Sequence, residues 1–272
     1  MYGIAKDVTI FLVLFVHKKN SLKPLNPRGC KMPNPLLTFE DIHTHIGPYH
    51  ILHGVDFAVP EGEVTMLLGR NGAGKTTALR SLMGLWKPNQ GRITFAGRDI
   101  SKLPTPEIAR LDIAYVPETM GIFASLTVRE NLLLATGAAG FQPDRLDEVL
   151  ALFPVLGQKF AQAAGGLSGG QKQMLAISRA IIEERRLLVV DEPTKGLAPA
   201  VILHLIEAFQ KLKAARTTIL LVEQNFEMAR ALGDTVAVME DGRIVHRGDM
   251  AALAVDTGLQ ERLLGLSLAA HQ

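Results

Sequence analysis

The chain has 272 residues, 47% of them hydrophobic and 21% charged, a composition typical of a folded α/β protein and not of a disordered or fibrous one. Its 29 basic and 27 acidic residues are spread along the sequence and give a net charge of +2, so we expect no nucleic-acid partner. The one cysteine, Cys30, excludes an internal disulfide, and no Cys/His cluster indicates structural zinc. A reducing cytosol fits these features best.

The first 31 residues differ in character from the rest of the chain. The apolar run at 9–16 has about half of the roughly 18 to 20 residues that a membrane-spanning helix needs. Asp7 precedes this run and no small-residue cleavage pattern follows it, which argues against a signal peptide. We therefore expect residues 1–31 to be disordered or wrongly assigned to the protein, with Met32 as the true start, a domain over 32–265 and a tail over 266–272.

Short apolar runs alternate with longer helical patterns, which predicts a mainly parallel sheet flanked by helices. The predicted strands cover 36–42, 57–59, 64–68, 93–95, 113–116, 187–190, 218–222, 235–239 and 243–246. Three of the runs are continuously apolar, as expected for central strands covered on both faces: 64–68, 187–190 and 219–222. Asp241-Gly242 predicts a hairpin, and so a small antiparallel element, between the last two strands.

Strand signals disappear between about residues 119 and 182. Helical patterns recur there at 128–138, 144–153 and 168–182. This change of pattern predicts a helical subdomain inserted into the sheet domain.

A glycine-rich loop follows the first buried strand and opens a helix. Its sequence, Gly69-Arg70-Asn71-Gly72-Ala73-Gly74-Lys75-Thr76, fits the full G-x-x-x-x-G-K-[ST] pattern. The glycines let backbone N–H groups point inward and the helix start adds positive potential, which makes a phosphate cradle. Lys75 is placed to reach the β and γ phosphates, and the Thr76 hydroxyl to hold Mg²⁺. The alternative, a glycine-rich turn with a capping threonine, explains the full motif less well. We predict that 69–77, Thr77 included, bind ATP.

Two carboxylates follow the second buried strand, at the end where open α/β sheets bind ligands. Asp191 is placed to hold Mg²⁺. Glu192 is the candidate general base that polarises the attacking water. Asp-Glu after a strand is by itself more often a solvated turn, but the phosphate loop favours the functional interpretation.

A second anion site is indicated by Leu167-Ser168-Gly169-Gly170-Gln171. Ser168 is expected to cap the following helix, while Gly169 and Gly170 expose backbone N–H groups next to Gln171. Such a site is expected to bind a phosphate group.

A phosphate cradle together with L-S-G-G-Q resembles the ABC ATPase family over nearly all of residues 36–265. The resemblance implies a P-loop NTPase fold of the ABC ATPase type. It also implies a head-to-tail dimer in which the signature of one subunit closes over the ATP held by the other. By the same resemblance, Tyr49 stacks on adenine; the alternative is a partly buried core tyrosine.

A closer resemblance is to LivF-type ATP-binding subunits of branched-chain amino acid importers. It rests on five segments: Tyr115-Val116-Pro117-Glu118, Leu126-Thr127-Val128-Arg129-Glu130-Asn131-Leu132, Gln173-Met174-Leu175-Ala176-Ile177, Gly196-Leu197-Ala198-Pro199 and Leu221-Val222-Glu223-Gln224-Asn225. Importers of urea or short amides share some of these segments and remain an alternative.

Three residues depart from most ABC ATPases and match the LivF type. Gln224 replaces His and cannot carry a titrating proton, so base catalysis falls to Glu192. Glu118 replaces Gln and is either a metal-site residue, accepting from the metal's water, or a solvated loop residue. Ala198 replaces Asp at the subunit junction, which predicts a heterodimer with a related ATPase subunit. Lys75 and Gln224 complete the predicted catalytic set.

The resemblance also implies partners and a location. These are two transmembrane permease subunits, a periplasmic or extracellular solute-binding protein, and the cytoplasmic face of the inner membrane. Phe123 and Leu126 are expected either to dock a permease helix or to pack in the core. A DNA-repair or ribosomal ABC ATPase is disfavoured by the absence of a coiled-coil insertion and of a second ATPase domain, and a catalytically dead regulator by the intact motifs.

Overall fold

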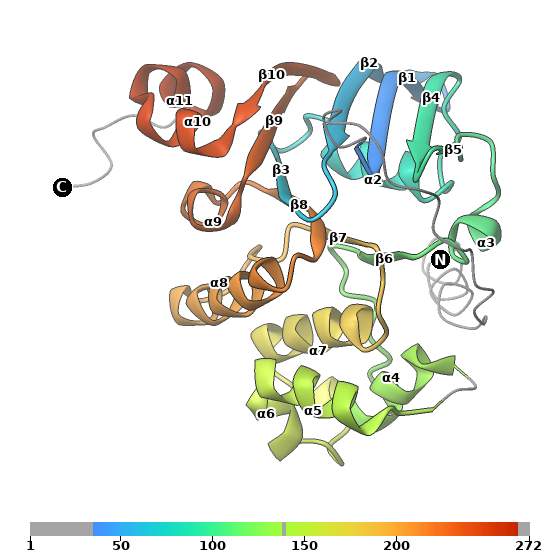
Figure 1. Cartoon of the computed structure of the whole chain (residues 1–272), viewed down its shortest axis with the longest axis vertical. Helices are drawn as coiled ribbons and strands as arrows, with labels where there is room; N and C mark the ends of the chain where they lie inside the picture. The colour runs from blue at the N-terminus through green and yellow to red at the C-terminus, as the bar shows by residue number, and fades with distance from the viewer. Residues whose placement is uncertain (1–34, 138–139, 266–272) are drawn as a thin grey trace, which may run out of the picture.

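A six-stranded sheet forms the centre of the protein (Figure 1). The computed structural model describes residues 35–137 and 140–265. The strand order is β10-β9-β3-β8-β7-β6, and the strands from β9 to β6 are parallel. Their bounds are β3 (Val64–Leu68), β6 (Ile113–Val116), β7 (Leu187–Asp191), β8 (Thr218–Glu223), β9 (Thr235–Glu240) and β10 (Arg243–Asp249). All residues of β3, β7 and β8 are buried, which confirms that the three apolar runs form the centre of the sheet.

A second sheet, antiparallel and four-stranded, has the order β2-β1-β4-β5. Its strands are β1 (Leu37–Ile46), β2 (Tyr49–Val59), β4 (Gln90–Phe95) and β5 (Arg98–Asp99). β5 was not predicted, the strand predicted at 57–59 covers only the end of β2, and these strands were not predicted to form a sheet of their own. The connection explains the separation: only Gly47 and Pro48 join β1 to β2, and so short a loop can link only antiparallel neighbours.

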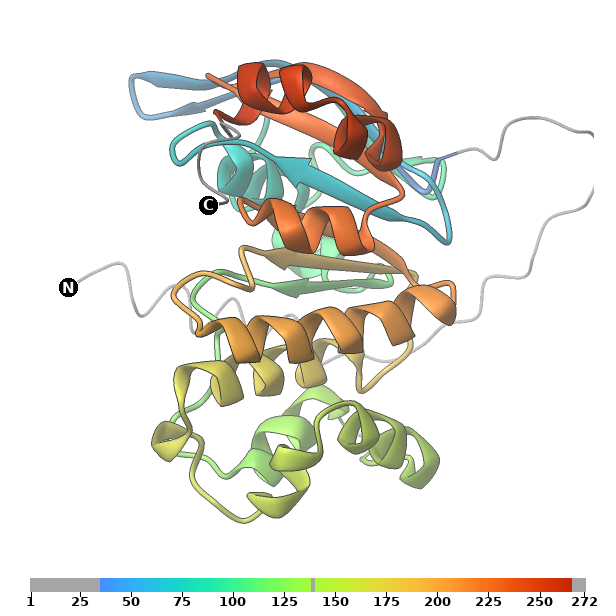
Figure 2. The ribbon, with the colours of Figure 1, turned by 90° about the vertical axis from the view of Figure 1, so that its left-hand side faces the viewer.

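The parallel sheet is covered on both faces because alternate residues of its strands enter two different cores. Met66, Val190 and Leu221 pack on one face among residues of α7 (Gly169–Ile181), α8 (Pro199–Ala214), α9 (Phe226–Leu232) and α10 (Met250–Val255). Leu67, Val189 and Val222 pack on the other face against the antiparallel sheet and α2 (Lys75–Leu82). Figure 1 shows the layers side by side, and Figure 2 looks onto the face of the parallel sheet that α8, α9 and α10 cover.

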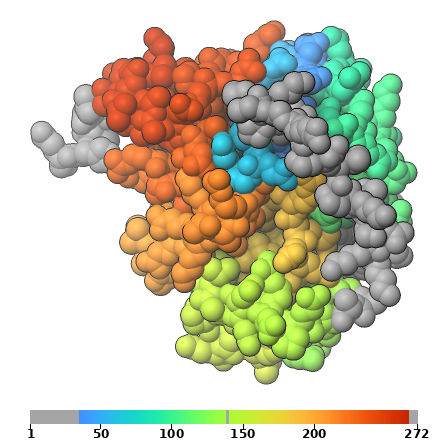
Figure 3. Space-filling model, viewed as in Figure 1, coloured from blue at the N-terminus to red at the C-terminus, as the bar shows by residue number. Residues whose placement is uncertain are grey.

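The chain between β6 and β7 contains helices and no named strand in the residues that the structure describes. These elements are α4 (Val128–Ala135), α5 (Pro143–Leu152), α6 (Pro154–Gln158), a 3₁₀ turn (Ala164–Gly166) and α7. They gather at one end of the molecule, the yellow-green lobe in Figure 3. The helices predicted at 144–153 and 168–182 agree with α5 and α7 within one residue at each end. The helix predicted at 128–138 ends at Ala135.

The remaining predictions concern the ends of the chain. β9 and β10 form the expected antiparallel hairpin, and Asp241 and Gly242 at its turn both have positive φ, 44° and 71°. The last helix is α11 (Thr257–Leu264), and α3 (Thr105–Ile108) precedes β6. Across the described ranges, none of the helices has the length and apolar character that crossing a membrane requires. The predictions for 1–31 and 266–272, Cys30 included, lie outside the described residues.

Candidate active site

The glycine-rich loop joins β3 to α2 as the motif requires. Gly69, Gly72 and Gly74 all have positive φ, at 155°, 82° and 106°. A Cβ on Gly69 would collide with the backbone carbonyl of Met239 in β9, and one on Gly74 would lie 3.0 Å from Leu52 Cδ2 in β2. Only glycine therefore fits where the loop passes between the two sheets.

Lys75 is the first residue of α2, and its side chain is buried in the loop. Its Nζ donates to the carbonyls of Gly69 at 2.8 Å and Arg70 at 3.1 Å. The same ammonium forms an ion pair with Glu192 Oε1 at 3.1 Å. The structure thus brings the lysine of the loop and the glutamate after β7 into direct contact, although 117 positions separate them in the numbering of the chain.

Asp191 ends β7 and is only 1% exposed. Its Oδ1 accepts a long hydrogen bond from Thr76 Oγ1 at 3.4 Å, and its Oδ2 is buried without a hydrogen-bond partner. Burial, with smaller contributions from the charges of Glu192 and Glu118, raises the pKa of Asp191 to about 6 against the hydrogen bond from Thr76. This carboxylate is incompletely satisfied, as expected of a group that holds a cation.

Glu192 lies immediately after β7 with a φ of 46°, and its backbone N–H donates to Val222 in β8. Gln224 Nε2 donates to Glu192 Oε1 at 2.8 Å and to Asn71 Oδ1 in the loop at 2.7 Å. Burial raises the pKa of Glu192, but hydrogen bonds from Gln224 and Lys75 and the charge of Lys75 outweigh burial and hold it below its usual value. Glu192 is therefore ionised at neutral pH and able to accept a proton.

Lys195 is a residue of the site that the sequence analysis missed. Its Nζ pairs with Glu118 Oε1 at 2.6 Å and lies 3.5 Å from Glu192 Oε2. The loop after β6, which carries Glu118, is thereby tied to the turn after β7. Glu118 is exposed but is not simply solvated, because it has this partner and its charge acts on Asp191. A lysine three positions after Glu192 was the only sequence signal for this contact.

The signature opens α7 as predicted. Ser168 Oγ accepts from the backbone N–H of Gln171 at 3.3 Å, and Gln171 Oε1 accepts from the N–H of Ser168 at 3.1 Å, a complete capping box. Gly169 is exposed, whereas Gly170 is buried and a Cβ there would meet Val201 Cγ1 at 2.6 Å. Gly170 therefore also permits the close packing of α7 on α8, a role the sequence analysis did not assign.

Tyr49 is the first residue of β2 and is 70% exposed. The alternative interpretation, a partly buried core tyrosine, is wrong. Leu52 in the same strand lies beside Gly74 of the glycine-rich loop, so β2 runs past the phosphate cradle. Phe123 and Leu126 are half-buried, and the Arg179 guanidinium lies 5.0 Å from the centroid of the Phe123 ring.

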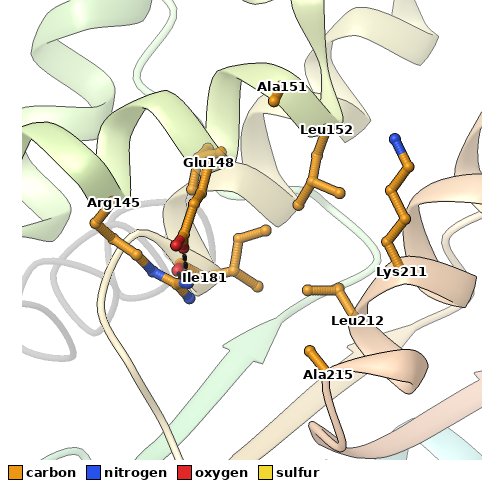
Figure 4. A pocket seen from close by; sticks show the side chains of 9 residues that line it. Arg145, Glu148, Ala151, Leu152, Ile181, Lys211, Leu212 and Ala215 are labelled. Atoms are coloured by element: carbon orange, nitrogen blue, oxygen red, sulfur yellow. Dashed lines mark hydrogen bonds and ion pairs between the residues drawn. The ribbon is translucent and has the colours of Figure 1, made fainter.

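A cavity of about 280 Å³ lies elsewhere, among α5, the end of α7 and α8 (Figure 4). Apolar side chains line it together with Arg145, Glu148 and Lys211. None of the predicted site residues borders it. The buried charged residues and the glycine cradle lie at the ends of β3 and β7. The candidate active site is therefore at these strand ends and not in the cavity.

A glycine cradle between a buried strand and a helix, next to an acidic pair at the end of a strand in the same parallel sheet, defines a P-loop nucleoside triphosphatase. Comparison with known proteins narrows this class. The family profile described as "ABC transporter" matches residues 52–195. The chain is 40% identical over 236 residues to the "High-affinity branched-chain amino acid transport ATP-binding protein BraG" of Pseudomonas aeruginosa, covering 85% of this chain and 100% of the relative.

Two further matches agree with this result. A probable branched-chain amino acid transport ATP-binding protein, LivF of Archaeoglobus fulgidus, is 36% identical, covering 80% of this chain and 93% of the relative. The crystal structure of the ADP conformation of MJ1267, an ATP-binding cassette of an ABC transporter, superposes with a TM-score of 0.73 at 27% identity, covering 86% of this chain and 100% of that one. The chain belongs to the ABC transporter family and is an ATP-binding cassette, an ATPase that works with transmembrane permeases.

Proposed function

We propose that the chain is the ATP-hydrolysing subunit of an importer for branched-chain amino acids. The observation that carries this proposal is the full-length match to BraG, combined with the contact between Lys75 and Glu192 at the phosphate loop. The match covers 85% of this chain and all of that relative. The match to LivF, a second ATP-binding protein named for the same solutes, supports the same assignment.

The loop at 69–77 is proposed to bind the phosphates of ATP through its backbone N–H groups and the start of α2. Lys75 Nζ, paired with Glu192 in the structure, supplies positive charge to the β and γ phosphates. Tyr49, exposed at the start of the strand that passes the loop, is proposed to provide an aromatic face for adenine. Arg70, Asn71, Ala73 and Thr77 complete the lining of the cradle.

The residues present also suit Mg²⁺. The hydroxyl of Thr76 and the carboxylate of Asp191 are hard oxygen donors, and Asp191 Oδ2 lacks a partner. Across the described residues, no group of three or more His, Cys, Asp or Glu is arranged to hold a metal alone, so water or phosphate oxygens would complete the coordination. When bound, Mg²⁺ neutralises charge on the terminal phosphates. Glu118 is proposed to accept from water on the metal.

Glu192 is proposed as the general base for water attack on the γ phosphate. It is ionised, buried and held by Gln224, which bridges it to the phosphate loop at Asn71. Gln224 is proposed to orient the base and, by giving up its hydrogen bond to Asn71, to donate an N–H to the γ phosphate. Because Gln224 does not titrate, Glu192 takes the proton alone.

The dimer is proposed to be a heterodimer with a related ATPase subunit. The signature residues 168–171 would close over the partner's ATP, and the exposed Gly169 at the start of α7 would offer its backbone N–H. Ala198 stands at the N-cap of α8 with no side-chain cap, so the junction lacks a carboxylate that the partner must replace. Tight ATP-dependent dimerisation of the purified chain alone, at full hydrolysis rate, would contradict this assignment.

The remaining assembly is proposed from kinship. Two permease subunits and a periplasmic or extracellular solute-binding protein complete the importer, and the chain sits on the cytoplasmic face of the inner membrane. The helical segment at about 119–182 is proposed as a subdomain of a domain spanning 32–265. Phe123 and Leu126, half-buried there, are proposed to dock a permease helix.

An importer of urea, short amides or other amino acids is the alternative, since an ATP-binding subunit does not contact the solute. The test is uptake of radiolabelled leucine, isoleucine, valine and urea by a strain lacking this chain and complemented with it. Restored uptake of the branched-chain amino acids alone supports the proposal, and restored uptake of urea alone supports the alternative. Lys75→Ala and Glu192→Gln should fail to complement, because each removes a charged group from the phosphate site.

A further inference from the structure

Glu223, the last residue of β8, accepts four hydrogen bonds that the proposed mechanism does not use. It is 1% exposed. Its Oε1 accepts from the backbone N–H of Thr194 at 3.0 Å. Its Oε2 accepts from Thr194 Oγ1 at 2.9 Å, from the N–H of Gln224 at 3.0 Å and from the N–H of Asn225 at 3.1 Å. All four donors are neutral, and no ion-pair partner of Glu223 is found among the described residues.

These hydrogen bonds join the two loops that carry the proposed base and its amide partner. Thr194 lies two positions after Glu192 in the turn that follows β7, whereas Gln224 and Asn225 follow β8. β7 and β8 are paired neighbours, with Asp191 opposite Val222. The contact from Gln224 Nε2 to Glu192 Oε1 then closes a ring through both loops. Glu223 accepts hydrogen bonds from both loops.

A carboxylate suits this position because every group that faces it is a donor. An ionised carboxylate accepts at both oxygens and donates nothing. A glutamine would turn an NH₂ group toward the N–H and O–H donors and leave some of them unpaired in a buried site. Burial raises the pKa of Glu223 above its usual value, and the hydrogen bonds from Asn225, Thr194 and Gln224 reduce this rise without reversing it.

We propose that Glu223 is a positioning residue that holds Gln224 and Glu192 together for ATP hydrolysis. This proposal rests on the proposed roles of Glu192 and Gln224. Glu223 touches neither the phosphate loop nor a reacting atom; it fixes the backbone from which Gln224 reaches Glu192. Its loss should slow hydrolysis while nucleotide binding persists, because the cradle at 69–76 belongs to a different strand and helix.

The test uses the purified transporter complex with Glu223→Gln. The turnover number kcat for ATP should fall by about tenfold or more, with KM for ATP changed by less than about twofold. In a Gln224→Ala background, Glu223→Gln should have much less effect on kcat, because both changes act on the same contact with Glu192. A wild-type kcat in Glu223→Gln, or an equal loss in both backgrounds, would overturn the proposal.

Thr194→Val is a second variant, for use if Glu223→Gln does not fold. It changes a residue of the other loop that donates to the same carboxylate. It removes one donor while keeping the shape of the side chain, so kcat should fall by a few fold with KM unchanged. An unchanged kcat would count against the proposal.

Asp234→Asn is the matched control. Asp234 also holds a strand end, accepting from Val64 N at 2.9 Å and pairing with Lys213, but at the opposite end of the parallel sheet. This change should lower thermal stability and leave kcat unchanged. A loss of kcat equal to that of Glu223→Gln would show that destabilisation alone explains both. Absence of ATPase activity in the wild-type complex would instead refute the proposed function.

Discussion

Two buried carboxylates end neighbouring strands of the parallel sheet and are satisfied in opposite ways. Asp191, at the end of β7, has one long hydrogen bond from Thr76 and an oxygen without a partner. Glu223, at the end of β8, receives four hydrogen bonds. Both groups are 1% exposed, so burial alone does not distinguish them. The difference lies in their partners.

An unpaired buried carboxylate destabilises a folded protein unless a ligand completes it. Asp191 is therefore best explained by the cation it is proposed to hold, whereas Glu223 is complete without one. At this edge of the sheet, Asp191 thus has an oxygen free to bind a ligand, whereas Glu223 holds the neighbouring loops in place. Changes at the two positions should separate these roles.

The largest effect is expected at Glu192, which lies next to Asp191. Glu192→Gln keeps the shape of the side chain and its contact with Gln224 but removes the basic carboxylate. ATP hydrolysis should fall by about 10²- to 10⁴-fold while ATP binding persists. Single-turnover hydrolysis beside nucleotide binding measures the two separately. Normal hydrolysis by this variant would show that Glu192 is not the base.

Asp191→Asn should stabilise the nucleotide-free protein. The pKa of Asp191 in the folded protein, about 6, lies above its ordinary value of 3.8. The contribution of this group to the free energy of unfolding is therefore fully present below pH 3.8 and is lost as the pH rises through 6. Removing the charge should recover on the order of 3 kcal/mol at pH 8 and about half as much at pH 5. Thermal unfolding at both values measures this gain. A loss of stability at pH 8 would contradict the contrast between the two carboxylates.

Glu223→Gln should act in the opposite direction on the same protein. Its amide would leave buried donors unpaired, so the free energy of unfolding should fall by about 1 to 3 kcal/mol. Denaturant unfolding of the nucleotide-free protein at pH 8, run beside Asp191→Asn, gives the comparison. If both variants changed stability with the same sign, the number of partners would not be what distinguishes these carboxylates.

The smallest effect is expected at His50, a half-buried histidine of β2 that lies against the other histidines of β1 and β2. Burial lowers the pKa of His50, and the nearby His53, His45 and His43 lower it further. A folded-state pKa below 6.5 means that stability present above pH 6.5 is lost as pH falls. His50→Gln should therefore narrow the difference in melting temperature between pH 8 and pH 5.5. An unchanged difference would show that these histidines do not interact.

Much of the site was predictable from local sequence. The glycine-rich loop and the pair Asp191-Glu192 each follow an apolar run, and parallel strands bring their ends to one edge of a sheet. The capping box of Ser168 and Gln171 is likewise contained within four positions. Contacts of this kind need only the local pattern and the fold class.

Contacts between distant segments were not predictable in this way. Glu223 was visible only as one residue of a family segment, because its partner Thr194 lies 29 positions away and meets it only through the pairing of β7 with β8. The pairing of Glu118 with Lys195 has the same origin. The separate antiparallel sheet was missed because the histidines of β2 hide its alternating pattern, although the turn at Gly47 and Pro48 allowed no other pairing.

The most direct measurement is the Mg²⁺ dependence of nucleotide affinity. A slowly hydrolysed ATP analogue is titrated into the wild-type protein and into Asp191→Asn, each with and without Mg²⁺. If the unpartnered oxygen of Asp191 completes a magnesium site beside the phosphate loop, Mg²⁺ should tighten binding to the wild type and have little effect on the variant. An equal response to Mg²⁺ in both proteins would contradict the account.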